Sequence, residues 1–451
     1  PSTMLPISLS LLLTFQGPSP PEALGLEALE EAVVELSLEN GWTFIILPKK
    51  GAPIVSFETF VDVGVCDEPI GMSGIVHMFE HMAFKGSDRI GTLDWPSEEA
   101  ALAEVDRLYA ELTDARSKDD ATNHTALEVA WAEAIESANA LIRRGEFSKL
   151  IERAGGAGSL KALTSADGCR FVVSLPSNQI ELWCWLESDR FQRPILREFY
   201  LERDTVLEER NMRVDSNPIG TVREELAASA FRVHPYGRPV IGSRADIERY
   251  DRERAVAFVD AHWAPDRCTT AIVGDVDPEV LIPMLERYFG RIPARETDQP
   301  VFSPEPEQRG ERRNLVEFPA QPLLAIGWSV PHASHADAPA VEVAIRLLGA
   351  ARSSRLQRRL IRDDPQCARV FVESGWPGDR HSNLAIVLAE PLEGADLKEV
   401  EDSILEEVQT LTTEGPDPKE LEGVLRVARV EHLSSLRHNH ALAEGLVSAQ
   451  V

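Results

Sequence analysis

Cysteine and basic side chains are scarce in this chain, and each shortage excludes a class of function. Only five cysteines occur among 451 residues, and none forms a C-x-x-C pair. A cysteine-rich zinc site or a thioredoxin-like redox motif is therefore not expected. Lys and Arg total 46 against 74 Asp and Glu, so the formal net charge is −28. Such an acidic chain is a poor partner for nucleic acid or an anionic membrane surface.

Apolar runs long enough to cross a membrane are also missing. One apolar run, Met4 to Phe15, stands near the start of the chain, and it is too short for a transmembrane helix. It resembles the apolar region of a secretory signal peptide, although the basic segment that precedes such regions is absent. The alternative is an unstructured leader on a cytoplasmic protein. We favour export to a bacterial periplasm and assign residues 1–30 to a leader or signal-like segment.

The remaining length allows two or more domains, each with an ample core. Strand patterns with an intervening Asn40-Gly41 turn open a first unit, residues 31–293. A segment rich in Pro, Glu and Gln, residues 294–313, is typical of an interdomain linker. Residues 314–451 repeat the order strand, helix, helix, strand, helix. The predicted fold is α+β, with two similar domains that each pack a mostly antiparallel sheet against helices.

Residues 97–143 differ in character from the rest of the first unit. Leucines and other apolar residues recur there at helical spacing on both sides of a polar break at residues 117–123. This pattern predicts an antiparallel helical hairpin with no chemistry of its own, inserted at about residues 95–145.

The pentad His77-Met78-Phe79-Glu80-His81 carries the strongest chemical signal. It has the form H-x-x-E-H, the reverse of the common zinc-protease order H-E-x-x-H. Successive residues turn a helix by about 100°, so His81 and Glu80 lie about 40° and about 60° to either side of His77. Two imidazoles, which suit zinc, then share a face with a carboxylate, which suits a base acting on metal-activated water. The pentad predicts a metallohydrolase.

The alternative is that these residues bind no metal, because such a pentad can arise by chance and a His pair on a helix is often packed or solvated. The apolar neighbours favour the metal. They make most of this helix apolar, and unpaired imidazoles are costly to bury there. These neighbours are Met78, Phe79, Met82 and Phe84.

A third ligand is needed, since catalytic zinc sites use three protein ligands and keep one open position. The predicted helix at residues 198–215 offers Glu202 and Glu209, which lie within about 20° of each other after two turns. One carboxylate could bind the metal while the other holds an imidazole. The alternative is a solvated acidic helix with pairs such as Glu209 and Arg213. Spacing alone does not choose between Glu208 and Glu209.

Several longer stretches of sequence match a known family. Through these stretches the chain resembles the pitrilysin/insulinase family of inverted zincins, a zinc metallopeptidase family, from about residue 33 to the end. The resemblance has the bacterial, half-length form. The matching stretches are Gly74–Gly86, Leu182–Arg190, Glu202–Arg210, His234–Gly237 and Ile272–Pro278.

This resemblance implies roles for individual residues. The family pattern E-R-x-x-V-x-x-E places the third zinc ligand on Glu209, beside His77 and His81, and makes Glu202 a supporting carboxylate. It implies that Glu80 is the general base. The implied activity is zinc-dependent endopeptidase cleavage of peptides or unstructured polypeptides through zinc-activated water. The implied fold is half of a clamshell.

Three departures from the family pattern stand out. The separation of His81 from Glu209 exceeds the family norm by about the length of the helical hairpin, which supports an insertion. Lys161 stands where the family has Asn on the strand that pairs with substrate. Arg362 could match the family Arg that steadies the reacting carbonyl, but Arg369 stands at the Tyr position. Groups from another subunit would then be required.

The chain ends at Val451, soon after a predicted helix at residues 417–438. We expect the second domain to be truncated at its C-terminus, and a second subunit or a missing C-terminal half to complete the chamber. The rival function is a non-catalytic scaffold or peptide-binding subunit of a peptidase assembly.

Overall fold

A computed structural model describes residues 29, 31–118, 121–295, 297 and 302–450. The predicted signal-like run, Met4 to Phe15, lies outside these residues. Within them, no helix combines the length and the apolar character needed to cross a membrane.

The first sheet has six strands in the order β1-β2-β6-β3-β5-β4. β2 and β6 run parallel, and the other neighbouring strands are antiparallel. This arrangement leaves β4 at an edge, with one side of its backbone unpaired within the sheet. The strands are β1 (Val34–Ser37), β2 (Thr43–Pro48), β3 (Ile54–Val61), β4 (Lys161–Thr164), β5 (Cys169–Pro176) and β6 (Cys268–Gly274).

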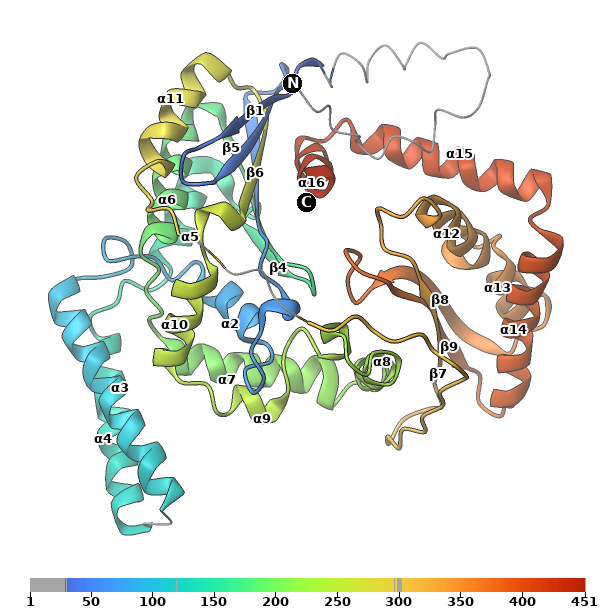
Figure 1. The fold of residues 1–451 in the computed structure, drawn as a ribbon, viewed down its shortest axis with the longest axis horizontal. Coiled ribbons are helices and arrows are strands. Elements are labelled where there is room, and N and C mark those ends of the chain that lie inside the picture. Colours follow the sequence, from blue (N-terminus) through green and yellow to red (C-terminus); the bar gives the residue numbers. More distant parts are fainter. Residues whose placement is uncertain (1–28, 30, 119–120, 296, 298–301, 451) are drawn as a thin grey trace.

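Helices cover one face of this sheet and enclose the main core, as Figure 1 shows. Aromatic rings hold the layers together: Phe57 of β3 stacks on Trp183 at 4.1 Å, and Trp42 meets Phe289 edge-on at 4.8 Å between ring centroids. The helices of this unit are α2 (Ile75–Met82), α5 (Glu146–Ile151), α6 (Ile180–Gln192), α7 (Phe199–Arg210), α8 (Pro218–Ala230), α9 (Arg244–Ile247), α10 (Arg252–His262) and α11 (Pro278–Phe289).

The predicted helical hairpin is present as α3 (Trp95–Ser117) and α4 (Ala121–Asn139), which pack on each other and extend away from the sheet (Figure 1). Its base is fixed to the body by the rings of Tyr109, Trp131 and Tyr200, whose centroids lie 4.7–5.3 Å apart. A buried ion pair adds to this anchor, because Arg197 Nε donates to Glu98 Oε1 at 2.7 Å. The hairpin is thus a projection on an intact core.

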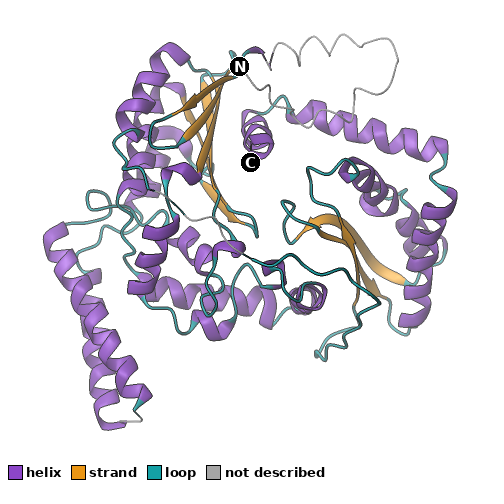
Figure 2. Cartoon of the chain, viewed as in Figure 1, coloured by secondary structure: helices purple, strands orange, loops and turns teal. Residues whose placement is uncertain are grey.

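The second sheet has three antiparallel strands in the order β7-β9-β8, separated from the first in Figure 2. Its own core joins the sheet to the helices beside it. The α+β prediction with mostly antiparallel sheets is therefore confirmed. The elements are β7 (Leu324–Val330), α12 (Ala338–Ile345), α13 (Arg355–Gln357), β8 (Cys367–Trp376), β9 (Asn383–Pro391), α14 (Leu397–Glu414) and α15 (Pro418–Ser435).

The last helix, α16 (Asn439–Gln450), returns to the first sheet instead of packing in the second unit. Its apolar side chains cover the sheet face opposite the main core, where they meet residues of β2, β3 and β6. Polar contacts fix its position: Asn439 donates to the Ile54 carbonyl at 3.2 Å, and His440 lies 3.9 Å from the buried Glu58. By its packing, α16 completes the first unit, although it lies within residues 314–451.

Candidate metal centre and its cleft

The start of α2 is fixed by an acidic cap and a glycine. Gly74 has φ 86°, and a Cβ there would lie 2.4 Å from the Ile241 carbonyl oxygen, so only glycine fits. The buried Glu68 carboxylate accepts from the backbone N–H groups of Gly74 and Val76 at 3.0 and 3.2 Å. These bonds satisfy donors that the helix itself leaves free. The pentad therefore starts from a defined position.

The two sides of α2 have different surroundings. On the apolar side, the ring of Phe79 packs on that of Trp263 with 3.8 Å between centroids. His77 is buried, while Glu80 and His81 are half-buried. These three side chains line a cavity of about 580 Å³. The structure thus brings the predicted polar trio to one cavity.

The helix α7 lies against α2 and supplies the predicted carboxylates. Glu209 Oε2 lies 3.1 Å from His81 Nε2 and 3.6 Å from His77 Nε2. The potential ligand atoms of these three residues all lie within 4.8 Å of one another. Glu202 Oε2 is 3.4 Å from the other ring nitrogen of His81, Nδ1, and Glu202 also pairs with Lys85. Glu208 is exposed and takes no part.

The electrostatics of this cluster favour a bound cation. Burial lowers the pKa of His77 to about 4, so its ring is neutral and a lone pair is free to bind metal. Burial also opposes charge on His81, but hydrogen bonds to Glu202 and Glu209 outweigh it and raise the pKa of His81 to about 9. Without metal, a proton on the His81 ring therefore balances part of the charge of these two carboxylates. The donors are those that zinc prefers, so the residues present fit a zinc ion.

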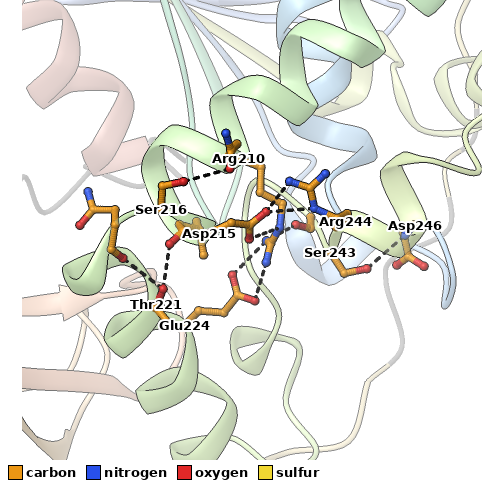
Figure 3. A network of polar contacts seen from close by, with 12 residues as sticks. Arg210, Asp215, Ser216, Thr221, Glu224, Ser243, Arg244 and Asp246 are labelled. Carbon is orange, nitrogen blue, oxygen red and sulfur yellow. Dashed lines mark hydrogen bonds and ion pairs between the residues drawn. The ribbon is translucent and has the colours of Figure 1, made fainter. Parts of the chain in front are cut away.

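A polar network, drawn in Figure 3, runs from Arg210 at the end of α7 to Asp246. Arg210, the neighbour of Glu209, donates to both carboxylate oxygens of Glu224 at 3.0 and 2.9 Å, and its Nε lies 3.3 Å from Asp215. Further along the network, Asp246 accepts from the backbone N–H of Ser73 at 3.1 Å, two residues before the start of α2. The network therefore links the third predicted ligand to the helix that carries the first two.

The edge strand β4 forms another wall of the cavity. Thr164 Oγ1 donates to Glu80 Oε2 at 2.5 Å, which orients the carboxylate expected to act as base. The second unit reaches the same cavity through Trp376 and Pro377. A further lining stretch on β4 is Ala162 and Leu163. The cleft thus lies between the edge strand, the metal cluster and the second unit.

Other sequence expectations lie outside this cavity. Lys161 is exposed at the start of β4. Arg362 is an exposed residue that pairs with its neighbour Asp363 at 2.7 Å. Arg369 is exposed on β8, 3.7 Å from Glu390. Neither arginine lines the cavity formed by the described residues.

Some polar partners in the cleft were not predicted from the sequence. Lys85 pairs with Glu198 at 3.1 Å as well as with Glu202. The pair of Glu209 and Arg213 that the helical spacing suggested is also present, with 2.9 Å between Arg213 Nη2 and Glu209 Oε1. The position of Lys85, one turn after His81, was a usable signal. No local spacing connects Thr164 with Glu80, because β4 reaches the cleft only through its pairing with β5 at the edge of the sheet.

Comparison with known proteins adds sequence and structural relatives. A family profile described as "Peptidase M16 inactive domain" matches residues 249–427, a stretch that lies beyond the pentad and Glu209. The zinc protease PqqE of Helicobacter pylori is 25% identical over 335 residues, which are 72% of this chain and 63% of that protein. The chain therefore spans less than two thirds of that curated relative.

Solved structures share the fold. A protease from Helicobacter pylori superposes with a TM-score of 0.77 at 21% identity, over 93% of this chain and 89% of that one. The periplasmic protease PqqL from Escherichia coli superposes with a TM-score of 0.66 at 15% identity, over 93% of this chain but only 42% of that one. The same fold therefore occurs both in chains of this length and as about half of a longer protease.

Proposed function

We propose that this chain, which belongs to the M16 family of peptidases, is a zinc-dependent endopeptidase that hydrolyses peptides or unstructured polypeptides. The observation that carries the proposal is the convergence of His77, His81, Glu209 and Glu80 on one cavity of about 580 Å³. The relative named a zinc protease supports the choice of metal.

Each residue then has a chemical task. His77, His81 and Glu209 hold the metal, and Glu202 holds the ring of His81 through Nδ1. When bound, zinc supplies a Lewis acid that lowers the pKa of water and polarises a carbonyl group. Glu80 accepts the proton of the attacking water and passes it to the leaving amine. The Thr164 hydroxyl keeps that carboxylate aimed into the cleft.

The edge strand β4 is suited to hold a peptide in an extended conformation. Its outer side is not paired with another strand of the six-stranded sheet, and Ala162 and Leu163 face the cleft. An added strand would gain main-chain hydrogen bonds there, which recognise backbone more than sequence. Lys161, in place of the family Asn, changes only the far end of this strand relative to Thr164 and Glu80.

A partner is part of this proposal. Because the chain covers 42% of the longer periplasmic protease, we propose that a second subunit or a C-terminal half closes the cleft. That subunit would supply the carbonyl-steadying groups that Arg362 and Arg369 are not placed to give. The same relative supports the proposal that this protein is exported to the periplasm.

The test compares the wild type with Glu80→Gln, using Glu208→Gln as a matched control on an exposed carboxylate. We expect the wild type to cleave an unstructured peptide in a zinc-dependent way, Glu80→Gln to bind zinc but lose activity by at least about 100-fold, and the control to behave as wild type. Bound zinc with no cleavage by the wild type, alone or with a candidate partner, would favour the scaffold function instead.

A further inference from the structure

A second cluster of metal-binding side chains lies at the junction of the two units. Cys66 lies in a short helical turn after β3, His234 follows α8, and His381 lies in the turn between β8 and β9. The potential ligand atoms of these three residues all lie within 4.8 Å of one another. The rings of His234 and His381 are 4.9 Å apart between centroids. None of the three belongs to the cluster at Glu209.

The His234 ring is the clearest sign of a ligand. It is only 6% exposed, and its Nε2 is buried without a hydrogen-bond partner in the structure. Aromatic rings surround it, those of Phe231, Tyr236 and Phe302, with centroids 4.5–6.0 Å away. A buried nitrogen that makes no hydrogen bond costs free energy, which a bound cation would recover.

We propose that Cys66, His234 and His381 bind a second Zn²⁺ ion, which fastens the β8–β9 turn of the second unit to the first unit. One thiolate and two imidazoles are a donor set that zinc accepts, with the fourth position left to water or a further ligand. Hard cations such as Mg²⁺ and Ca²⁺ prefer oxygen donors and do not fit.

The protonation states are compatible with this ion. Burial lowers the pKa of both histidines, that of His234 to about 4, so both rings are neutral. Burial, with help from the Asp167 charge, raises the pKa of the Cys66 thiol to about 12, and a coordinated zinc ion would displace that proton.

One existing contact would change. The Tyr236 backbone N–H donates to Nδ1 of His234 at 3.2 Å, so a metal at Nε2 would move the ring proton to Nδ1 and break this bond. A single neutral hydrogen bond is worth far less than zinc binding at a Cys and His site.

The surroundings indicate what the ion would stabilise. Asp167 accepts a hydrogen bond from the Tyr236 hydroxyl and others from the backbone N–H groups of Asp379 and Arg380, at 2.8 and 3.3 Å. The same turn is continuous with Trp376, which lines the catalytic cavity. A metal at His381 would therefore fix one wall of the cleft. This inference does not depend on peptidase activity.

Cobalt substitution distinguishes the two sites, because a thiolate-to-cobalt charge-transfer band requires a cysteine ligand and the His77, His81 and Glu209 cluster has none. We expect reduced wild type titrated with Co²⁺ to develop this band, and to bind two Zn²⁺ per chain by elemental analysis. Cys66→Ser should lose the band and one zinc. Cys367 is a buried cysteine outside both clusters, so Cys367→Ser should keep the band and both zinc ions.

Two more variants keep the test decisive if Cys66→Ser folds poorly. Glu209→Gln should keep the band because it alters only the other site, and His381→Ala should weaken or abolish it while circular dichroism stays unchanged. Absence of the band in reduced wild type, or a band that survives in folded His381→Ala and Cys66→Ser, overturns the proposal. A zinc count of one that falls only with Glu209→Gln does the same.

Discussion

Removing the carboxylate of Glu202 tests how the proposed metal site is held. Glu202 Oε2 lies 3.4 Å from His81 Nδ1, on the side of the ring away from Glu209, and its side chain is only 16% exposed. In the proposed site it would therefore act on the metal through the imidazole, by fixing the ring and by making the opposite nitrogen a better donor. Outer carboxylates of this kind are worth about 10- to 100-fold in metal affinity.

Two substitutions separate orientation from charge. Gln at position 202 keeps an acceptor for the ring N–H but loses the charge, so we expect zinc affinity to fall about 10-fold, or about 1.4 kcal/mol. Ala loses both, and we expect a fall toward 100-fold, or about 2.7 kcal/mol. In both variants Lys85 loses one of its two carboxylate partners and keeps Glu198. Its less balanced positive charge then repels a bound zinc ion, which lowers zinc affinity further.

The assay is competition for zinc against a chromophoric chelator at constant pH and ionic strength. Glu208→Gln serves as the control, because it makes the same charge change on an exposed position of the same helix. Zinc affinity within about twofold of wild type in both Glu202 variants would refute the assigned role of this carboxylate. Equal losses in Glu208→Gln would show that net charge, and not contact with His81, sets the affinity.

Three further predictions concern stability. Gly74→Ala places a Cβ 2.4 Å from a carbonyl oxygen at φ 86° and should destabilise the fold by about 2 kcal/mol or more, whereas Gly71→Ala, at φ 84° with open space, shows the backbone strain alone in the same thermal unfolding assay. Glu98→Ala removes the carboxylate partner of the buried Arg197 guanidinium, which keeps only backbone carbonyl acceptors, and should cost about 3–5 kcal/mol in urea unfolding. A loss within error of zero would refute a stabilising role for this ion pair. Burial raises the pKa of Glu58 above 4.5, so the folded chain keeps a proton that the unfolded chain releases, and stability should fall as pH rises from about 4.5 toward the folded pKa. Glu58→Gln should flatten that part of the pH–stability curve, and an unchanged slope would contradict the assignment.

The candidate metal cluster could be predicted from the sequence because its geometry is set within single helices. The positions of His77, Glu80 and His81 on α2, and of Glu202 and Glu209 on α7, follow from 3.6-residue periodicity. The choice of Glu209 over Glu208 rested on family resemblance, and the structure agrees because Glu208 faces solvent. At these positions the helical spacing alone places the polar side chains on one face of each helix.

Features that depend on distant packing were not predictable in the same way. Cys66, His234 and His381 come from separate segments, and no spacing rule connects them until the two units are placed together. The position of α16 could not be predicted for the same reason. Its order in the chain groups it with residues 314–451, whereas its apolar face packs on the first sheet, on the face opposite the main core. Local pattern gives an element its type, while the partner surface decides where it packs.

The return of α16 has a consequence for synthesis of the protein on the ribosome. Asn439 contacts Ile54 across 385 residues, so one face of the first sheet stays uncovered until α16 has emerged. Contacts of such separation form late, and an uncovered apolar face is prone to aggregation in the meantime. A nascent chain that ends after residues 294–313 should therefore carry His77, His81 and Glu209 beside a sheet with one uncovered face and require chaperone protection, whereas synthesis of α16 completes the layer.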